Sequence, residues 1–302
     1  MRERLVSLYR KFRNWMQGVD AHERTLTLLG AMFAHQISTK RNISSLHEVE
    51  FRVFSQWGDD GIIQWLLARM PELPKTFIEF GVEDYSESTT RFLTLNNNWR
   101  GLVMDGSPEK IARLGGQKWF WRHDLTATSH FLTRDNINKI IEEWADEEKL
   151  GLLHIDVDGN DFWLWDAIQC ITPSIVIVEY NALFGSERAI TVPYVENFQR
   201  HTAHYSGQYA GASLAAITWL GQKKGYALIG TNSAGNNAYY VHVSELTEEV
   251  RSVAVDIAFV KSNFRDSRDR RGRMTYLSFE ERQSLIRGLP MFNVLTGELE
   301  PF

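Results

Sequence analysis

The sequence predicts an α/β fold: a mostly parallel, doubly wound sheet closed by an antiparallel β-hairpin and preceded by a helical arm. Short apolar runs alternate with helix-compatible segments along the middle of the chain, which is the pattern of parallel βα units. Two runs, 152–157 and 174–180, are almost continuously apolar, as strands buried on both faces of a sheet must be. Two β-prone segments flank the turn cluster TNSAGNN at 231–237, which is typical of a hairpin.

The composition limits the class of protein. Hydrophobic residues make up 43% and charged residues 24% of the 302 residues, so the chain should be globular. The net charge of −5 gives no reason to expect a nucleic acid partner, and no apolar run approaches the roughly 20 residues of a membrane span. The single cysteine, Cys170, excludes an internal disulfide and fits a reducing compartment. We therefore expect a cytoplasmic protein.

Residues 1–50 are predicted to form the helical arm. Its first segment carries apolar side chains at helical spacing, namely Leu5, Leu8, Tyr9, Phe12 and Trp15. The simplest interpretation is an arm that packs on the core or on a second subunit, which would give a homo-oligomer. Because acids are interspersed among the basic residues, attraction to an anionic membrane surface is the weaker alternative. The segment lacks the continuous apolar centre of a signal peptide.

The remaining elements follow in order. A turn at 58–61 precedes a helix predicted over 62–70, with Asp60 near its N-terminus. Strands are expected at 76–80, 101–104, 117–121, 151–156 and 174–180. Helices are expected at 87–97, 108–114, 134–148, 160–170 and 211–224. The hairpin strands follow at 226–231 and 237–243. These elements place a core at 51–245 and leave a C-terminal extension at 246–302 that packs on it.

The stretch 76–105 is the most informative for function. A strand that carries Glu79 stops at Gly81, a helical segment follows, and a second strand ends at Asp105. In a βαβ unit the first turn brings the backbone close to a ligand, and an acid at the end of the second strand accepts hydrogen bonds from a ribose diol. The region therefore predicts a site for an adenosine-containing cofactor.

A second group of polar residues follows the two buried strands. Alternation puts Asp156 and Asp158 on one strand face, and Asp161 falls in the first turn of the next helix, where the dipole favours a carboxylate. Glu179 and Asn181 end the adjacent strand. Oxygen ligands of this kind select Mg²⁺ or Ca²⁺. The alternative is that Asp156 contacts the cofactor, Asp161 caps its helix and no metal binds.

Four segments together resemble FkbM-type class I S-adenosylmethionine methyltransferases. They are FSQWGDDGII (54–63), FIEFGVEDYSESTTRFL (77–93) with WRGLVMDGSP (99–108), LLHIDVDGNDFWLWDAI (152–168) with SIVIVEYNALFG (174–185), and ASLAAITWLGQKKGYALIGTNSAGNNAYYV (212–241). The resemblance implies a Rossmann-like class I methyltransferase fold and S-adenosylmethionine as cofactor. It also implies methyl transfer to a hydroxyl of a sugar, a polysaccharide or a natural product, with a small molecule or glycan as the acceptor.

The turn after the first strand departs from the usual methyltransferase pattern. Only Gly81 is present, and Glu83 and Asp84 follow it. These acids would repel phosphate but attract the ammonium or sulfonium of S-adenosylmethionine. The pyrophosphate of NAD needs closer backbone approach at a helix N-terminus, so the turn favours S-adenosylmethionine over NAD.

The resemblance also implies residue roles in cofactor binding. Glu79 and Gly81 would lie beneath the methionine part of the cofactor, Asp105 would hold the ribose hydroxyls, and Asp124, placed after the third strand, would meet the adenine amine. Gln56 could reach the cofactor from the N-terminal side. The alternatives are structural: Asp105 as the cap of the helix near Pro108, Glu79 as an acceptor for turn amides, and Gln56 with Asp60 as part of a turn.

The acceptor side has candidates for a base and a metal. Asp158 and His204 are the candidate bases, the latter in a pocket with Tyr205 and Tyr209, whereas His154 is expected to be a core histidine that faces away from Asp156. The acids are similar to those of macrocin-type sugar O-methyltransferases, in which Mg²⁺ holds adjacent hydroxyls and lowers a hydroxyl pKa. Asp158, Glu179 and Asn181 are then the expected ligands of Mg²⁺.

Two other classes of function stay open. The acids Asp156, Asp158 and Asp161 would also suit a metal-dependent transferase or hydrolase of phosphate esters. The turn with a single glycine would suit a non-catalytic scaffold on a degenerate methyltransferase fold.

Overall fold

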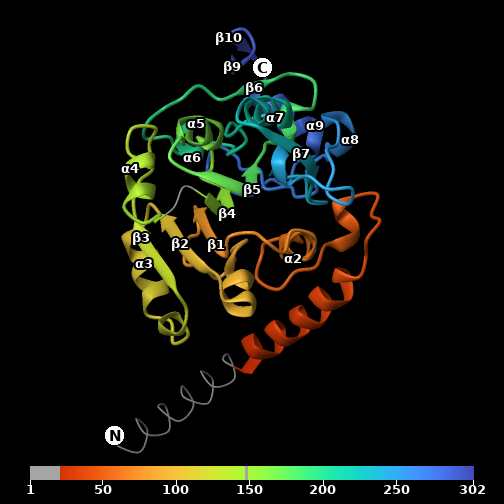
Figure 1. Ribbon diagram of the computed structural model, residues 1–302. Coiled ribbons are helices and arrows are strands. Elements are labelled where there is room, and N and C mark those ends of the chain that lie inside the picture. Colours follow the sequence, from red (N-terminus) through yellow and green to blue (C-terminus); the bar gives the residue numbers. More distant parts are fainter. Residues whose placement is uncertain (1–20, 147–148) are drawn as a thin grey trace, which may run out of the picture.

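The computed structural model of the protein describes residues 21–146 and 149–302 (Figure 1). The apolar spacing predicted around Leu5 to Trp15 lies outside the described residues, as do the last two residues of the helix expected at 134–148. From residue 76 onward strands alternate with helices and collect into one large sheet at the centre of the molecule.

The large sheet has seven strands in the order β3-β2-β1-β4-β5-β8-β7. Its first five strands are parallel, and β8 lies antiparallel between β5 and β7. The bounds are β1 Thr76–Phe80, β2 Arg100–Asp105, β3 Leu125–Ser129, β4 Lys149–Ile155, β5 Thr172–Glu179, β7 Tyr226–Thr231 and β8 Asn237–His242. A parallel sheet closed by this antiparallel hairpin is the Rossmann-like class I methyltransferase fold, so the predicted fold is confirmed.

Helices cover both faces of the sheet because successive strand residues point to opposite sides. Phe77 packs in one buried cluster with α2 and α3, whereas Ile78 packs in the opposite cluster with α4, α5 and α7. The bounds of these helices are α2 Asp59–Arg69, α3 Pro108–Gly115, α4 Ile137–Glu142, α5 Asp161–Ala167 and α7 Leu214–Lys223. Both faces are therefore apolar, which explains the continuous apolar runs in β4 and β5.

Three predicted elements differ from the observed ones. The strand expected at 117–121 is wrong, because this segment holds the short 3₁₀ helix η3, Phe120–Arg122, and β3 begins only at Leu125. The helix expected at 87–97 is reduced to residues 91–97, of which Leu93–Asn97 form the π-helical turn η2. Asn98 ends this turn with a φ of +53°. The helix α4 is also shorter than predicted.

Residues outside the large sheet form an arm and a second, smaller sheet. The arm is a helix over residues 21–38, followed by the 3₁₀ helix η1 Leu46–Val49. The smaller sheet has the order β10-β9-β6, and the arm helix and the C-terminus lie on opposite sides of the molecule (Figure 1). The remaining bounds are η4 Ala182–Phe184, β6 Ile190–Thr191, α6 Arg200–Ala203, η5 Val243–Glu245, α8 Val255–Ala258, α9 Phe279–Ile286, β9 Pro290–Asn293 and β10 Glu298–Pro301. Among the helices that the structure describes, none combines the length and the apolar character needed to cross a bilayer.

Candidate functional site

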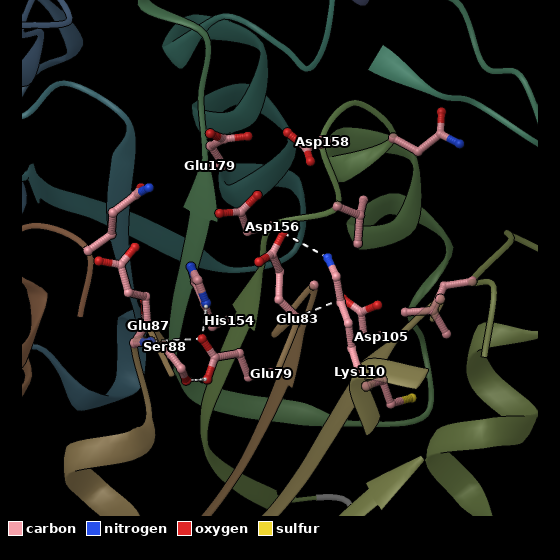
Figure 2. Close-up of a pocket in the computed structure, with 18 of the residues that line it drawn as sticks. Glu79, Glu83, Glu87, Ser88, Asp105, Lys110, His154, Asp156, Asp158 and Glu179 are labelled. Atoms are coloured by element: carbon pink, nitrogen blue, oxygen red, sulfur yellow. Dashed lines mark hydrogen bonds and ion pairs between the residues drawn. The ribbon is translucent and has the colours of Figure 1, made fainter. Parts of the chain in front are cut away.

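A cavity of about 500 Å³ lies at the carboxyl ends of the central strands (Figure 2). Gly81 after β1, Asp105 at the end of β2, Asp156 after β4 and Glu179 at the end of β5 all line it. Ligands of open α/β sheets bind at this edge. The structure thus brings residues from both predicted clusters around one space.

The turn after β1 depends on Gly81. Its φ is +76°, and a Cβ atom at this position would lie 1.7 Å from the carbonyl oxygen of Asp156. The two strand ends therefore touch through backbone alone, and only glycine fits. The turn continues through Glu83 and Tyr85, which also have positive φ values. Non-glycine residues therefore adopt the left-handed conformations in the rest of this turn.

The side chain of Glu79 binds the segment 88–90, which follows this turn. Its carboxylate accepts hydrogen bonds from the Thr89 and Thr90 backbone amides and from the Ser88 and Thr90 hydroxyls. It also bonds His154 Nδ1 at 3.0 Å, because Glu79 and His154 are opposite one another in the β1–β4 ladder. Burial raises the pKa of Glu79, but His154, Ser88 and Thr90 outweigh this and lower it. These contacts match the structural alternative for Glu79, which is an acceptor of hydrogen bonds from backbone amides.

Asp105 connects β2 to the same turn. One carboxylate oxygen accepts the Glu83 amide and the other accepts the Ser107 amide, both at 2.8 Å. The N-cap of α3 is Ser107, whose hydroxyl accepts the Lys110 amide, so Asp105 is not the cap of that helix. Each oxygen keeps a lone pair for a ligand, since a carboxylate has about four acceptor positions.

Acidic side chains crowd the part of the cavity next to β4 and β5. Asp156, Asp161 and Glu179 each offer an oxygen, and these oxygens lie within 4.8 Å of one another. Burial first, and then the charge of Asp158, raises the pKa of Asp156 to about 6. Burial and the charge of Asp156 raise the pKa of Asp161 to about 7 and that of Glu179 well above its usual value. Such a group retains protons or binds a cation.

The loop after β4 is held in an unusual conformation at the edge of this cluster. Asp158 has a φ of +58° and Gly159 one of +153°, and Asp161 accepts the Val157 and Gly159 amides. Asp158 faces the cavity and pairs with Arg200 Nη1 at 3.1 Å. A non-glycine residue in the left-handed region is uncommon and occurs often at functional sites.

Three predicted site residues lie elsewhere. Asp124 precedes β3 instead of following the third strand, so it lies at the opposite edge of the sheet, and its side chain is 73% exposed beside Arg100. His204 follows α6 and bonds the Ser206 hydroxyl without lining the cavity. Asn181 uses its amide to cap η4 and to bond the Gln208 and Ala210 carbonyls, so it does not join Glu179 as a ligand.

The cavity also contains residues that the sequence patterns did not single out. Asp59 lines it and accepts hydrogen bonds from Asn237, Asn232 and Tyr239. His154 lines it as well, although it was expected to be a core histidine that faces away from Asp156. Figure 2 shows its ring between Glu79 on one side and the acids on the other. The GDDG turn was a signal for Asp59, whereas the pairing across β1 and β4 has no signal in a single sequence.

Several buried polar atoms of the cavity wall have no partner among the described residues. They are His154 Nε2, Asn160 Oδ1 and Asn237 Oδ1, and the three residues are at most 5% exposed. A buried polar atom without a partner costs free energy. These atoms therefore indicate that a polar ligand or ordered water completes the site.

No protein-family model matches this sequence, and a comparison with curated proteins gives no match either. Solved structures with a similar fold include the N-terminal domain of EvdMO1 with SAH bound, at 11% identity over 62% of this chain and 80% of that chain with a TM-score of 0.40. An O-methyltransferase from Bacillus cereus in complex with SAH matches at 13% identity over 58% and 77%, with a TM-score of 0.37. The SAH-bound methyltransferase PaMTH1 from Podospora anserina matches at 14% identity over 62% and 82%, with a TM-score of 0.40. Similarity at this level does not extend to site residues or substrates.

Proposed function

We propose that the protein is an S-adenosylmethionine-dependent methyltransferase that acts on a hydroxyl oxygen of a sugar, a polysaccharide or a natural product. The observation that carries the proposal is the convergence of Gly81, Asp105 and the acids after β4 and β5 around one cavity on this sheet. The four segments that resemble FkbM-type enzymes support the choice of acceptor. The single cysteine supports a cytoplasmic location.

The cofactor belongs over β1 and β2 in this proposal. Asp105 would accept hydrogen bonds from the ribose diol through the lone pairs that its two backbone partners leave free. The acids around the cavity favour a ligand that carries a sulfonium and an ammonium group. Lys110 pairs with Glu83 at 2.8 Å across the turn, so this cation is already neutralised and offers little to a pyrophosphate.

The acceptor belongs over β4 and β5. Methyl transfer needs the acceptor oxygen aligned with the sulfonium and a route for its proton. Asp158 is the proposed base, because it lines the cavity and its side chain is 65% exposed. His204 lies outside the cavity and therefore cannot serve as the base there. Unpartnered oxygens of Asn160 and Asn237 would accept hydrogen bonds from hydroxyl groups of a polar acceptor.

A magnesium ion fits the acid cluster in part. Asp156, Asp161 and Glu179 supply oxygen donors close enough to share one ion. The raised pKa values of Asp156 and Asp161 show that burial and neighbouring carboxylates destabilise their ionised forms. A bound cation would stabilise these ionised forms. Asp158 stands at the edge of this group, whereas Asn181 is turned away. A bound Mg²⁺ would polarise an acceptor hydroxyl and lower its pKa.

Calorimetric titration with S-adenosylhomocysteine tests the cofactor site. We expect micromolar binding by the wild-type protein and at least about tenfold weaker binding by Asp105→Ala, because hydrogen bonds to a charged group contribute about 1.5–3 kcal/mol. Asp124→Ala is the matched control, since it removes an exposed acid at the opposite edge of the sheet and should leave the affinity unchanged. Equal affinity of wild type and Asp105→Ala would remove Asp105 from the ribose.

The same titration separates the other classes of function. Repeating it with Mg²⁺ and then with chelator shows whether the ion contributes to the site. A wild-type protein that does not bind S-adenosylhomocysteine under any of these conditions would support the scaffold. Mg²⁺-dependent cleavage of phosphate esters without S-adenosylmethionine would support the hydrolase.

A further inference from the structure

The arm carries exposed apolar side chains, one of which, Phe33, also contacts Phe51 of the body of the protein. Leu28, Leu29, Met32 and Phe33 are 64%, 45%, 61% and 50% exposed, respectively, and we call these four residues the arm strip. Positions separated by four residues lie one above the other on a helix, so the strip is continuous. Contiguous exposed apolar surface of this kind marks an interaction site more often than scattered single residues do.

The inner face of the same helix is fixed to the body of the protein. Gly30 lies so close to Val53 and Phe92 that a Cβ atom would approach them within 2.6–2.8 Å. Glu23 pairs with Arg91 at 2.7 Å. Residues 25–38 contain no Asp, Glu, Lys or Arg, so no charged side chain interrupts the exposed apolar residues of this part of the helix.

The charge of the chain is divided unevenly about this helix. Residues 1–20 contain five Lys and Arg and two acids, a net charge of +3, which leaves −8 for residues 21–302 because the whole chain carries −5. The cationic part directly precedes the arm strip in the sequence. Basic residues next to an apolar helix face favour binding to anionic lipid head groups, to which each Lys or Arg contributes about 1 kcal/mol.

A second exposed aromatic residue lies in a segment that meets the arm through Arg91. The guanidinium of Arg91, which binds Glu23 of the arm, lies 5.3 Å from the ring of Trp119. Two residues further on, Trp121 is 77% exposed and stacks with Arg122 at 5.3 Å. Tryptophan beside a basic residue is the combination found at the interface between membrane and water.

We propose that the arm strip docks on the surface of an anionic lipid bilayer, with the basic residues before it against the head groups. A second copy of the chain is the rival occupant. The net charge of +3 on residues 1–20 favours an anionic lipid surface over contact with the same segment of a second copy. Docking leaves the cavity of the proposed methyltransferase free, since its lining residues do not include the arm strip.

Flotation of the full chain with lipid vesicles tests this proposal. We expect binding to phosphatidylcholine vesicles that contain about one third phosphatidylglycerol, little binding to phosphatidylcholine alone, and loss of binding at high salt. Leu28→Ser with Met32→Ser should weaken binding at least about tenfold, because two apolar side chains no longer enter the lipid. Arg10→Ser with Lys11→Ser and Arg13→Ser should weaken it similarly.

The matched control is Leu295→Ser with Leu299→Ser. These leucines are 63% and 64% exposed. They belong to the hairpin of β9 and β10, which lies at the end of the molecule opposite the arm (Figure 1), so the control should bind vesicles like the wild type. Equal loss in the control, no binding by the wild type, or unchanged binding by the Leu28 and Met32 variant would each overturn the proposal. So would light scattering that shows a wild-type dimer that this variant converts to a monomer.

Discussion

The backbone of Gly81 lies so close to that of Asp156 that no Cβ atom fits between them. The missing side chain of Gly81 lets the turn after β1 lie directly against the first residue after β4. This contact sets the distance between the turn that we assign to the cofactor and the acids that we assign to the acceptor. A methyl transfer would depend on that distance, because the reacting atoms must lie about 3–3.5 Å apart and in line.

Substitution of Gly81 by alanine should therefore damage the site as well as the fold. Gly185→Ala is a matched control, because Gly185 has the same φ of +76° but a Cβ atom there would meet nothing within 4 Å. We expect Gly185→Ala to cost about 1–3 kcal/mol of unfolding free energy from backbone strain alone, because its ψ of −171° places it in a region that essentially only glycine adopts. Gly81→Ala should cost at least about 3 kcal/mol and weaken S-adenosylhomocysteine binding as well. Urea unfolding and calorimetry would measure both, and equal effects of the two variants would contradict this account.

Gly81 and Asp105 could be predicted from the sequence because each ends a strand, and a strand end fixes which edge of the sheet a residue occupies. The environment of His154 could not be predicted in the same way. Alternation along β4 assigns its face, but its partner Glu79 comes from another strand through a register that only the fold defines. Asn181 was misassigned because an amide after a strand can serve equally as a ligand or as a local cap.

At the scale of elements, the start of α2 holds the loop that carries Gln56 to the cavity. Asp60 lies in the first turn of α2, and one of its carboxylate oxygens accepts the Val53, Phe54 and Ser55 amides. Gln56 follows and lines the cavity. Asp60 is buried, and burial raises its pKa to about 6 although these amide bonds oppose the shift. The loop that carries Gln56 is therefore attached to α2 through the carboxyl group of Asp60, and the protonation state of this group affects the attachment.

This pKa predicts how stability depends on pH. The folded pKa of about 6 exceeds the ordinary value of 3.8, so between these values the folded state binds more protons than the unfolded state. Stability therefore falls as pH rises through this range, by up to about 3 kcal/mol from Asp60 alone. The pKa values of Asp156, Asp161 and Glu179 are raised as well, so the test compares the pH dependence of a variant with that of the wild type.

Asp60→Asn removes this ionisation while keeping an oxygen for the three amides. Urea unfolding at about pH 4 and about pH 7.5 should show a smaller loss of stability in Asp60→Asn than in the wild type. Asp124→Asn, an exposed acid, should follow the wild type at both pH values. A pH dependence of Asp60→Asn that runs parallel to the wild type would show that Asp60 stays ionised in the folded protein.

Element prediction succeeded where burial on both faces makes the pattern plain and failed at the edge of the sheet. β4 and β5 are central, and their apolar runs were recognised with small errors at their ends. β3 is the edge strand, and four of its five residues are only partly buried, so its sequence LTATS carries no strong apolar signal. The aromatic segment before it is more apolar but forms a turn and the 3₁₀ helix η3, and Trp119 at the start of η3 packs near Tyr85. Because β3 follows this segment, Asp124 precedes the strand. It therefore lies at the amino ends of the parallel strands and not at their carboxyl ends.

At the scale of the whole molecule, the C-terminal extension contributes strands to a sheet that begins in the middle of the chain. β9 pairs with β6, and Phe292 of β9 contacts Trp163 of α5 with ring centroids 5.1 Å apart. Since α5 begins at Asp161, the extension supports the helix that anchors the acid cluster. Sequence patterns predicted that this region packs on the core, but not which element it pairs with, because a two-residue strand such as β6 has no periodicity to recognise.

The extension should accordingly unfold together with the core rather than before it. Met291 of β9 is fully buried in a cluster with Ile190, Val192 and Ile286, so Met291→Ala should lower the unfolding free energy by about 2–5 kcal/mol through the cavity that it leaves. Met274→Ala is the control, because Met274 is 37% exposed and should cost less than about 1 kcal/mol.

Urea unfolding of Met291→Ala, followed by tryptophan fluorescence and by S-adenosylhomocysteine binding, should give one transition with a common midpoint. A common midpoint is expected because Phe292 and Trp163 couple the smaller sheet to α5. If the smaller sheet unfolded first and S-adenosylhomocysteine still bound, the extension would be a separate folding unit. That result would contradict the proposal that the extension supports the acid cluster through α5.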